Sequence, residues 1–152
     1  MPIVKERTVK YGLRIKKMTR REAREEVLNL LFESEFRSDE SEKEIYATSK
    51  ENREFSDDDY VERAYFKIVE SKEEIDATIG EHAHGWKTQR LSRVSRAILR
   101  LAVYELLYEK DIPASVTINE AVELSKKYDE EKARAFINGV LNSVKNSLDA
   151  EK

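Results

Sequence analysis

The chain of 152 residues contains no cysteine, and only two prolines, four glycines and two histidines. Without cysteine it has no disulfide framework, no thiol nucleophile and no thiolate zinc site. No apolar run approaches the roughly 18 residues that a membrane span needs, and the first residues contain no apolar signal-peptide core. These absences favour a cytoplasmic protein of about one domain, without a membrane-spanning segment.

The scarcity of glycine and histidine argues against an enzyme site. The glycines lie too far apart for a P-loop or a GxGxxG turn, because each of these needs at least two glycines within about six residues. His82 and His84 are two residues apart on an expected helix, so they point to different faces and do not share a metal ion. We therefore expect no catalytic residue, no metal site and no cofactor.

Charged residues are abundant, at 39% of the chain, and they are unevenly distributed. Residues 1–24 hold nine basic and two acidic side chains, a net charge of +7. Residues 25–86 have a net charge of −12 and residues 87–152 a net charge of +2, so the overall charge of −3 conceals the segregation. A basic segment of this kind favours a local anionic partner, although a solvated tail would have the same composition.

Helical periodicity recurs along the chain, and no segment shows the sustained alternation of a β-strand, so the predicted fold is all-α. Capping signals predict that helices begin at Thr19, Ser41, Ser56 and Ser71. The acidic stretch after Ser41 is compatible with either a short helix or a loop. Gly80 and Gly85 make continuation of the helix after Ser71 unfavourable, so we expect the chain to turn before Trp86.

The C-terminal half carries the strongest helical patterns. Residues 92–109 are apolar on two sides of the helical wheel, which predicts a central buried helix. Pro113 interrupts this pattern, and a capping box predicts a new helix from Thr117 to about Tyr128. A last helix has an apolar stripe that contains Gly139. Because glycine costs a helix about 1 kcal/mol relative to alanine, we expect a neighbouring helix to approach closely at Gly139.

Basic residues cluster at the start of the first helix. Arg20, Arg21 and Arg24 lie in or next to its first turn, where a positive charge opposes the helix dipole at a cost of roughly 0.3–1 kcal/mol. A bound phosphate would remove this cost, and Arg20 and Arg24 share one face at i,i+4. The alternative interpretation is that these arginines only increase solubility.

A second basic stripe lies on the predicted central helix, at Arg93, Arg96 and Arg100. It either binds an anion or covers apolar surface with the stems of its side chains. Backbone contacts give little choice of sequence, so base recognition would require single-stranded nucleic acid stacked on aromatic or arginine planes. The candidate platforms, each of which is otherwise a core residue, are Phe32, Tyr128 and Phe136.

Five segments between Thr19 and about Ser147 resemble the NusB family. They read RREARE at 20–25, RAILRLAVYEL at 96–106, DIP at 111–113, INEAVELSK at 118–126 and FINGVL at 136–141. The resemblance implies an all-α, NusB-like domain over residues 18–152, made of two small antiparallel bundles with about six to seven helices. The sub-bundles are expected over about 18–85 and 86–152, and residues 1–17 are expected to be a flexible basic extension.

The resemblance also implies a function. NusB-like proteins are antitermination factors, not enzymes, that bind the boxA RNA of nascent ribosomal RNA transcripts together with NusE, a ribosomal protein of the small subunit. They then join the elongating RNA polymerase with other Nus factors. The residues implied for RNA binding are Arg20, Arg21, Arg24, Arg93, Arg96, Lys126, Lys127 and Phe136. Those implied for partner binding are Phe32, Ser95, Tyr128 and Lys132; Ser95 and Lys132 replace acids found in some relatives.

Two other functions remain open from the sequence. The chain is also compatible with a helical adaptor that binds only proteins, through its aromatic residues. It is further compatible with a stand-alone relative of the RNA-binding domain of RNA cytosine methyltransferases, although no cysteine is present to attack a base. The sequence does not distinguish a monomer from a homodimer.

Overall fold

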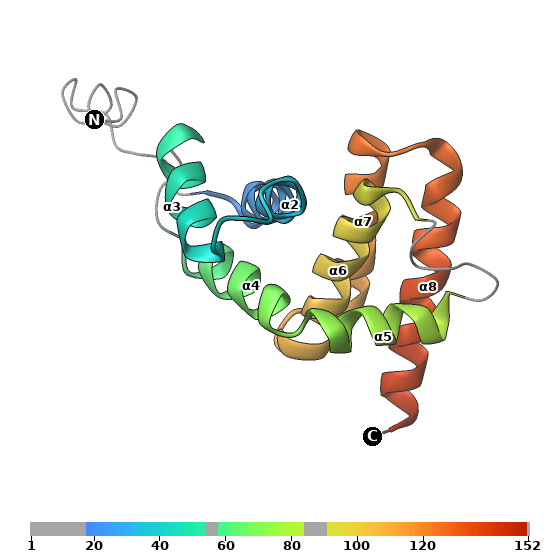
Figure 1. Cartoon of the computed structure of the whole chain (residues 1–152). Helices are drawn as coiled ribbons and strands as arrows, with labels where there is room; N and C mark the ends of the chain where they lie inside the picture. Colours follow the sequence, from blue (N-terminus) through green and yellow to red (C-terminus); the bar gives the residue numbers. More distant parts are fainter. Residues whose placement is uncertain (1–17, 54–57, 84–90, 152) are drawn as a thin grey trace. The chain divides into compact units, whose positions relative to one another are not determined.

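The computed structural model describes residues 18–53, 58–83 and 91–151. Within these ranges the chain forms seven helices and no strand, which confirms the all-α prediction (Figure 1). The helices are α2 (Arg20–Phe36), α3 (Glu42–Arg53), α4 (Asp59–Glu70), α5 (Lys72–His82), α6 (Arg93–Tyr108), α7 (Ala114–Tyr128) and α8 (Glu131–Ala150). None of these seven is long and apolar enough to cross a membrane. The predicted N-terminal extension lies outside the described residues.

The chain divides into two compact units, of which the first ends at Phe66 and the second begins at Lys67. The sub-bundles implied by the family resemblance divide near residue 85, one helix later in the chain than these two units do. The reason is that α5 packs against α6 and α8 and therefore belongs with the C-terminal helices.

In the first unit, α2 begins with the predicted capping box. The Thr19 hydroxyl accepts the backbone N–H of Glu22 at 3.1 Å, and the Thr19 N–H donates to the Glu22 carboxylate at 2.9 Å. This reciprocal pair satisfies two backbone donors that a helix start leaves unpaired. The prediction for this helix start is confirmed.

The acidic stretch after Ser41 is a helix rather than a loop. The Ser41 hydroxyl accepts the N–H of Glu44 at 3.2 Å and donates to its carboxylate at 3.0 Å. For α4, the carboxylate of Asp58 accepts the N–H groups of Tyr60 and Val61 at 2.9 and 3.1 Å. Asp58 is thus the capping group in the structure, whereas the predicted cap, Ser56, lies outside the described residues.

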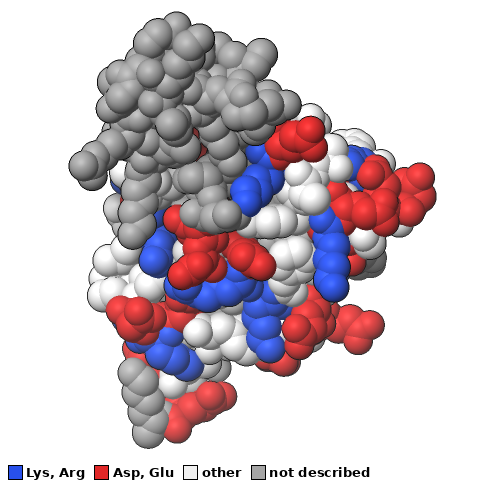
Figure 2. Space-filling model, turned by 90° about the vertical axis from the view of Figure 1, so that its left-hand side faces the viewer, with Lys and Arg blue, Asp and Glu red and all other residues white. Residues whose placement is uncertain are grey.

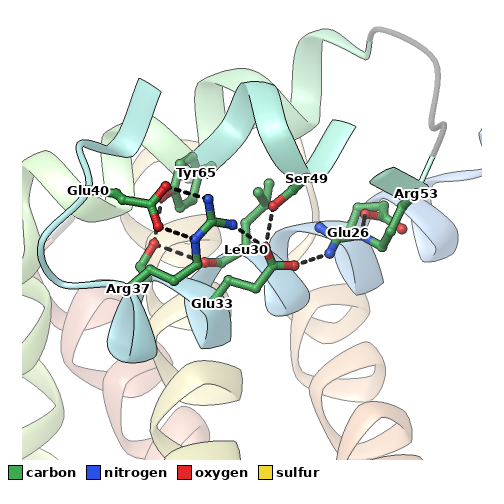
Figure 3. A network of polar contacts seen from close by, with 9 residues as sticks. Glu26, Leu30, Glu33, Arg37, Glu40, Ser49, Arg53 and Tyr65 are labelled. Carbon is green, nitrogen blue, oxygen red and sulfur yellow. Dashed lines mark hydrogen bonds and ion pairs between the residues drawn. The ribbon is translucent and has the colours of Figure 1, made fainter. Parts of the chain in front are cut away.

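A polar network joins α2 to α3 (Figure 3). Glu33 on α2 accepts hydrogen bonds from Ser49 and Arg53 on α3, and from Arg37 at 3.3 Å. Arg53 also donates to Glu26 at 2.8 Å. The side chains of Glu33, Arg37 and Arg53 are 25–28% exposed, so these ion pairs lie at the edge of the interior rather than within it.

A bidentate ion pair spans the loop that follows α2. The Arg37 guanidinium donates to both carboxylate oxygens of Glu40, each at 2.6 Å. This hydrogen-bonded pair lowers the pKa of Glu40 and raises that of Arg37. Nearby, burial raises the pKa of the Tyr65 hydroxyl, which lies 2.6 Å from the hydroxyl of Ser34. The links between α2, α3 and α4 are thus partly polar.

The second unit is built around α6. α7 and α8 lie beside it, and α5 packs against α6 and α8 (Figure 1). α6 begins at a cap in which the Ser92 hydroxyl accepts the N–H of Ser95 at 3.0 Å. Every residue from Ala97 to Leu106 is buried. This confirms the prediction of a central buried helix with apolar residues on two sides.

One of two predicted helix starts in this unit is confirmed and the other is wrong. α5 begins directly after Ser71, as predicted, although the Ser71 side chain makes no capping bond, and α5 continues through Gly80 to His82. α7 begins at Ala114, directly after Pro113, rather than at Thr117. Thr117 does not cap the helix, because it lies within α7; its hydroxyl donates to the buried carboxylate of Glu105 at 2.7 Å. The predicted turn before Trp86 lies outside the described residues.

The expectation for Gly139 is also wrong. Gly139 is exposed, and a Cβ atom placed on it would meet no atom within 4 Å. No neighbouring helix therefore requires a glycine at this position. The apolar stripe of α8 is instead buried through neighbouring positions, Ile137, Val140, Leu141 and Val144.

The described residues do not form a surface of one sign on the face shown in Figure 2. Lysine and arginine side chains lie there among aspartate and glutamate side chains. The predicted RNA-binding residues therefore differ from the other basic residues by their local contacts. The first of them lies on α2.

Candidate nucleic-acid interface

Of the three arginines near the start of α2, two are exposed to solvent. Arg20 and Arg21 are exposed, whereas Arg24 is buried, with 4% of its surface exposed. Arg24 lies between Ala23 and Val27 on the side of α2 that faces the interior, and both neighbours are buried as well. The structure therefore does not bring Arg24 to the surface with Arg20 and Arg21.

Tyr60 holds Arg20 in place. The Arg20 guanidinium carbon lies 4.3 Å from the centre of the Tyr60 ring, and that of Arg63 lies 5.5 Å from the same ring. The ring is 2% exposed, while both arginines are exposed. Arginines from α2 and α4 thus meet at one aromatic side chain. Sequence reasoning missed Arg63; its only signal was the i,i+3 spacing from Tyr60.

In the second unit a hydrogen-bonded link joins the start of α6 to the turn between α7 and α8. The Ser92 hydroxyl donates to that of Ser95 at 3.1 Å, and Ser95 donates to the Asp129 carboxylate. Asp129 also accepts the backbone N–H of Glu130 at 2.9 Å. Ser95 is 6% exposed. The hydroxyl of Ser95, which was predicted to contact a partner, takes part in this internal link.

Basic side chains surround the Ser95–Asp129 link. We call this region, from the first turn of α6 to the turn between α7 and α8, the α6–α8 corner. Arg93 is exposed and Arg96 half-buried in the first turn of α6, which contains no acidic residue. Lys126 and Lys127 are exposed in the last turn of α7. Because the Ser95–Asp129 link holds these two turns together, the structure brings these four predicted RNA-binding residues to one end of the second unit.

Three further predicted residues lie at or near the same turn. Tyr128 is 41% exposed, and the Lys127 ammonium lies 5.3 Å from the centre of its ring. Lys132 is exposed and lies 3.9 Å from a carboxylate oxygen of Glu130. Phe136, on α8, is half-buried. The corner therefore combines positive charge with aromatic surface, the two components that binding of a single strand requires.

Arg100 does not extend the basic stripe. Its guanidinium donates to both carboxylate oxygens of Asp76 on α5, at 2.8 and 2.9 Å, and the residue is 9% exposed. This two-pronged pair is a structural contact between α5 and α6. The stripe predicted at Arg93, Arg96 and Arg100 therefore ends at Arg96.

Phe32 lies on α2 beside a second aromatic residue that the sequence reasoning missed. The rings of Phe32 and Phe36 are nearly parallel, at 3°, with centres 6.5 Å apart. Phe32 is half-buried, and Phe36 is 64% exposed. An exposed aromatic pair of this kind suits a protein partner better than the solvent.

The described histidine, His82, takes part in a contact between helices. His82 lies with Nδ1 2.7 Å from the Ser143 hydroxyl, in a contact between α5 and α8, and His84 lies outside the described residues. Among the residues that the structure describes, no three His, Cys, Asp or Glu side chains are grouped closely enough to hold a metal ion.

Comparison with known proteins identifies relatives along most of the chain. The profile of the NusB family matches residues 21–146. The transcription antitermination protein NusB of Bacillus pumilus (strain SAFR-032) is 43% identical over 131 residues, which cover 86% of this chain and 98% of the relative.

Two solved structures are also similar. One is T. maritima NusB, with 40% identity, a TM-score of 0.77, and coverage of 86% of this chain and 93% of that one. The other contains the antitermination factors NusB and NusE in complex with dsRNA, with 31% identity, a TM-score of 0.75, and coverage of 84% and 96%. Membership of this family supports the prediction that the chain is not an enzyme. The similarities in sequence and fold together show that the chain belongs to the NusB family.

Proposed function

We propose that this protein is a cytoplasmic transcription antitermination factor that binds the boxA element of nascent ribosomal RNA together with NusE. In this role it joins the elongating RNA polymerase with other Nus factors. One observation supports the proposal most strongly: a solved NusB with 31% identity, which this chain covers to 96%, is in complex with NusE and dsRNA. The names of the curated relatives, all transcription antitermination proteins, support the same function.

The exposed basic residues and the half-buried Arg96 are assigned to the phosphate backbone. Arg20 and Arg21 act in the first unit, and Arg93, Arg96, Lys126 and Lys127 act at the α6–α8 corner. Guanidinium groups suit this task because their planar N–H groups match the oxygens of a phosphate. Phe136 is assigned to base stacking, since phosphate contacts alone carry little sequence information.

Two predicted residues receive a different role because they are buried. Arg24 packs inside the first unit, and Ser95 holds the α6–α8 corner through Asp129. We assign both to positioning the exposed basic residues rather than to contact with RNA. NusE is assigned to the surfaces that contain Phe32, Tyr128 and Lys132, all of which are at least partly exposed.

The proposal is tested by measuring the affinity for a boxA single strand at several salt concentrations. Binding to phosphates releases counterions, so log K falls linearly with log salt, with a slope of about −0.7 per phosphate contact on a single strand. Arg21→Ala is expected to flatten the slope by about 0.7. Lys43→Ala, which removes an exposed charge from α3, is the matched control and should leave it unchanged. An unaltered slope in Arg21→Ala would contradict the assignment of this residue to phosphate.

A second experiment tests joint binding with NusE. If NusE and RNA bind cooperatively, NusE raises the affinity for RNA, and RNA raises the affinity for NusE by the same factor. Fluorescence anisotropy of labelled boxA RNA, with and without NusE, measures the first factor. Equal RNA affinity in both titrations would rule out cooperative loading. Failure to bind RNA in both titrations would favour the adaptor function, in which the aromatic pair Phe32–Phe36 binds protein alone.

A further inference from the structure

Arg20 is not the only arginine that contacts the ring of Tyr60. The guanidinium carbons of Arg20 and Arg63 lie 4.3 and 5.5 Å from the same ring centre, although the two residues come from different helices. Arg63 lies one turn after Tyr60 on α4, and both arginines are exposed. The ring, at 2% exposed, is a fixed element of the interior.

Such an arrangement brings two like charges close together. Their repulsion is offset in part by the negative face of the aromatic ring, which attracts each guanidinium. Stacking also restricts the rotamers of two long side chains, so less conformational entropy is lost when a ligand binds. A guanidinium stacks on a ring through its face, and its planar N–H groups match the oxygens of a phosphate.

We infer that Arg63 is a further RNA phosphate contact, and that Tyr60 is the positioning residue that holds Arg20 and Arg63 for it. The inference rests on the proposed RNA-binding function and extends the arginine surface of α2 onto α4. It assigns a role to a residue that lies outside the five segments on which the family resemblance was recognised. The occupant is the sugar-phosphate backbone of a single-stranded RNA, because a pair of positioned cations complements its repeating negative charge.

The decisive variant is Arg63→Ala, measured with boxA RNA at several salt concentrations beside Arg21→Ala and Lys43→Ala. We expect Arg63→Ala to flatten the salt slope by about 0.7, which corresponds to about fivefold weaker binding at 0.1 M salt. Arg63→Lys should retain the slope because the charge remains. A merely structural role for Arg63 would change stability without changing the slope.

The role of Tyr60 is tested with two substitutions. Tyr60→Phe keeps the ring and should bind RNA as the unchanged protein does, whereas Tyr60→Leu removes the ring and should weaken binding. Circular dichroism verifies that each variant is folded. If Tyr60→Leu does not fold, Arg63→Ala still decides the question, because Arg63 is exposed.

The outcomes separate this inference from the proposed function. If Arg21→Ala flattens the slope and Arg63→Ala does not, the Arg63 assignment is overturned while RNA binding stands. If the unchanged protein binds boxA RNA without any dependence on salt, the proposed phosphate contacts fail, and the role of Arg63 fails with them.

Discussion

Each of the two units of this protein is stabilised internally by a different kind of contact. In the second unit, ten consecutive residues of α6, from Ala97 to Leu106, are buried. The helices α5, α7 and α8 all pack against α6. In the first unit, α2 and α3 are joined by ion pairs centred on Glu33, whose side chain is 26% exposed. The second unit depends chiefly on apolar burial, and the first adds a network that water reaches.

This difference determines how each unit responds to its surroundings. Apolar burial depends little on salt or on pH near neutrality. Ion pairs that are partly exposed weaken as salt screens them, and they lose a partner when a carboxylate is protonated. We therefore expect the contacts between α2 and α3 to be the more adjustable part of the protein.

The largest expected effect is in the apolar core of the second unit. Leu99 is completely buried, so Leu99→Ala removes methyl groups and leaves a cavity. We expect a loss of about 2–5 kcal/mol in the free energy of unfolding, measured by urea denaturation followed by circular dichroism. Val116→Ala, at an exposed position on α7, is the control and should change stability by less than about 0.5 kcal/mol. A loss below that of the control would contradict the central role of α6.

The next effect concerns the link between α5 and α6. Arg100→Met removes both hydrogen bonds to Asp76, whose side chain is 28% exposed. Because water partly solvates the remaining carboxylate, we expect a cost of about 1–3 kcal/mol, below that of a fully buried pair. Hydrogen exchange should become faster in α5 in particular. Lys72→Met, at an exposed site on α5, is the control, and equal exchange in both variants would argue against this role of the pair.

A smaller and salt-dependent effect is expected in the first unit. Glu33→Gln removes the charge that Arg37, Ser49 and Arg53 share, at a cost of about 1 kcal/mol because the site is partly exposed. The cost should shrink in 1 M salt, since screening has by then already weakened the pairs. Urea denaturation at two salt concentrations measures it, with Glu51→Gln as the exposed control. A cost that salt does not change would show that shape, rather than charge, joins α2 to α3.

The smallest effect is the titration of Glu40. Its pKa is lowered from the ordinary 4.5 by the hydrogen bond from Arg37. The stabilisation is therefore present above the ordinary pKa and is lost as the pH falls through the lowered value. Arg37→Gln should raise the pKa of Glu40 toward 4.5, as measured by NMR of the side-chain carboxyl carbon. Lys43→Gln should leave this pKa unchanged, and an unaltered pKa in Arg37→Gln would contradict the assigned cause.

Helices with strong patterns were predictable from the sequence, and their exact starts were less so. The capping box at Thr19 and the buried residues of α6 followed from local spacing alone. The box predicted at Thr117 failed because Thr117 lies within α7, where its hydroxyl donates to the buried carboxylate of Glu105, which is twelve residues away in sequence. Local spacing does not reveal such a distant partner.

The candidate interface shows the same division. The sequence placed Arg20 and Arg21 at a helix start, and the family resemblance implied Lys126 and Lys127; the structure finds all four exposed. The sequence did not reveal that Arg24 is buried, because the exposure of a helix face depends on what packs against it. The sequence also gave no reason to connect Arg63 with Arg20, because the two meet only through the ring of Tyr60.

The sequence by itself determined the all-α class, the central helix and the family, because helical periodicity, caps and motifs are written in neighbouring residues. Only the tertiary structure decided that α5 joins the second unit, that Ser95 bonds Asp129 across 34 positions, and that Arg100 pairs with Asp76. The physical reason is that polar side chains take whichever partner the packing of helices brings within hydrogen-bond distance. That choice depends on residues far away in the chain.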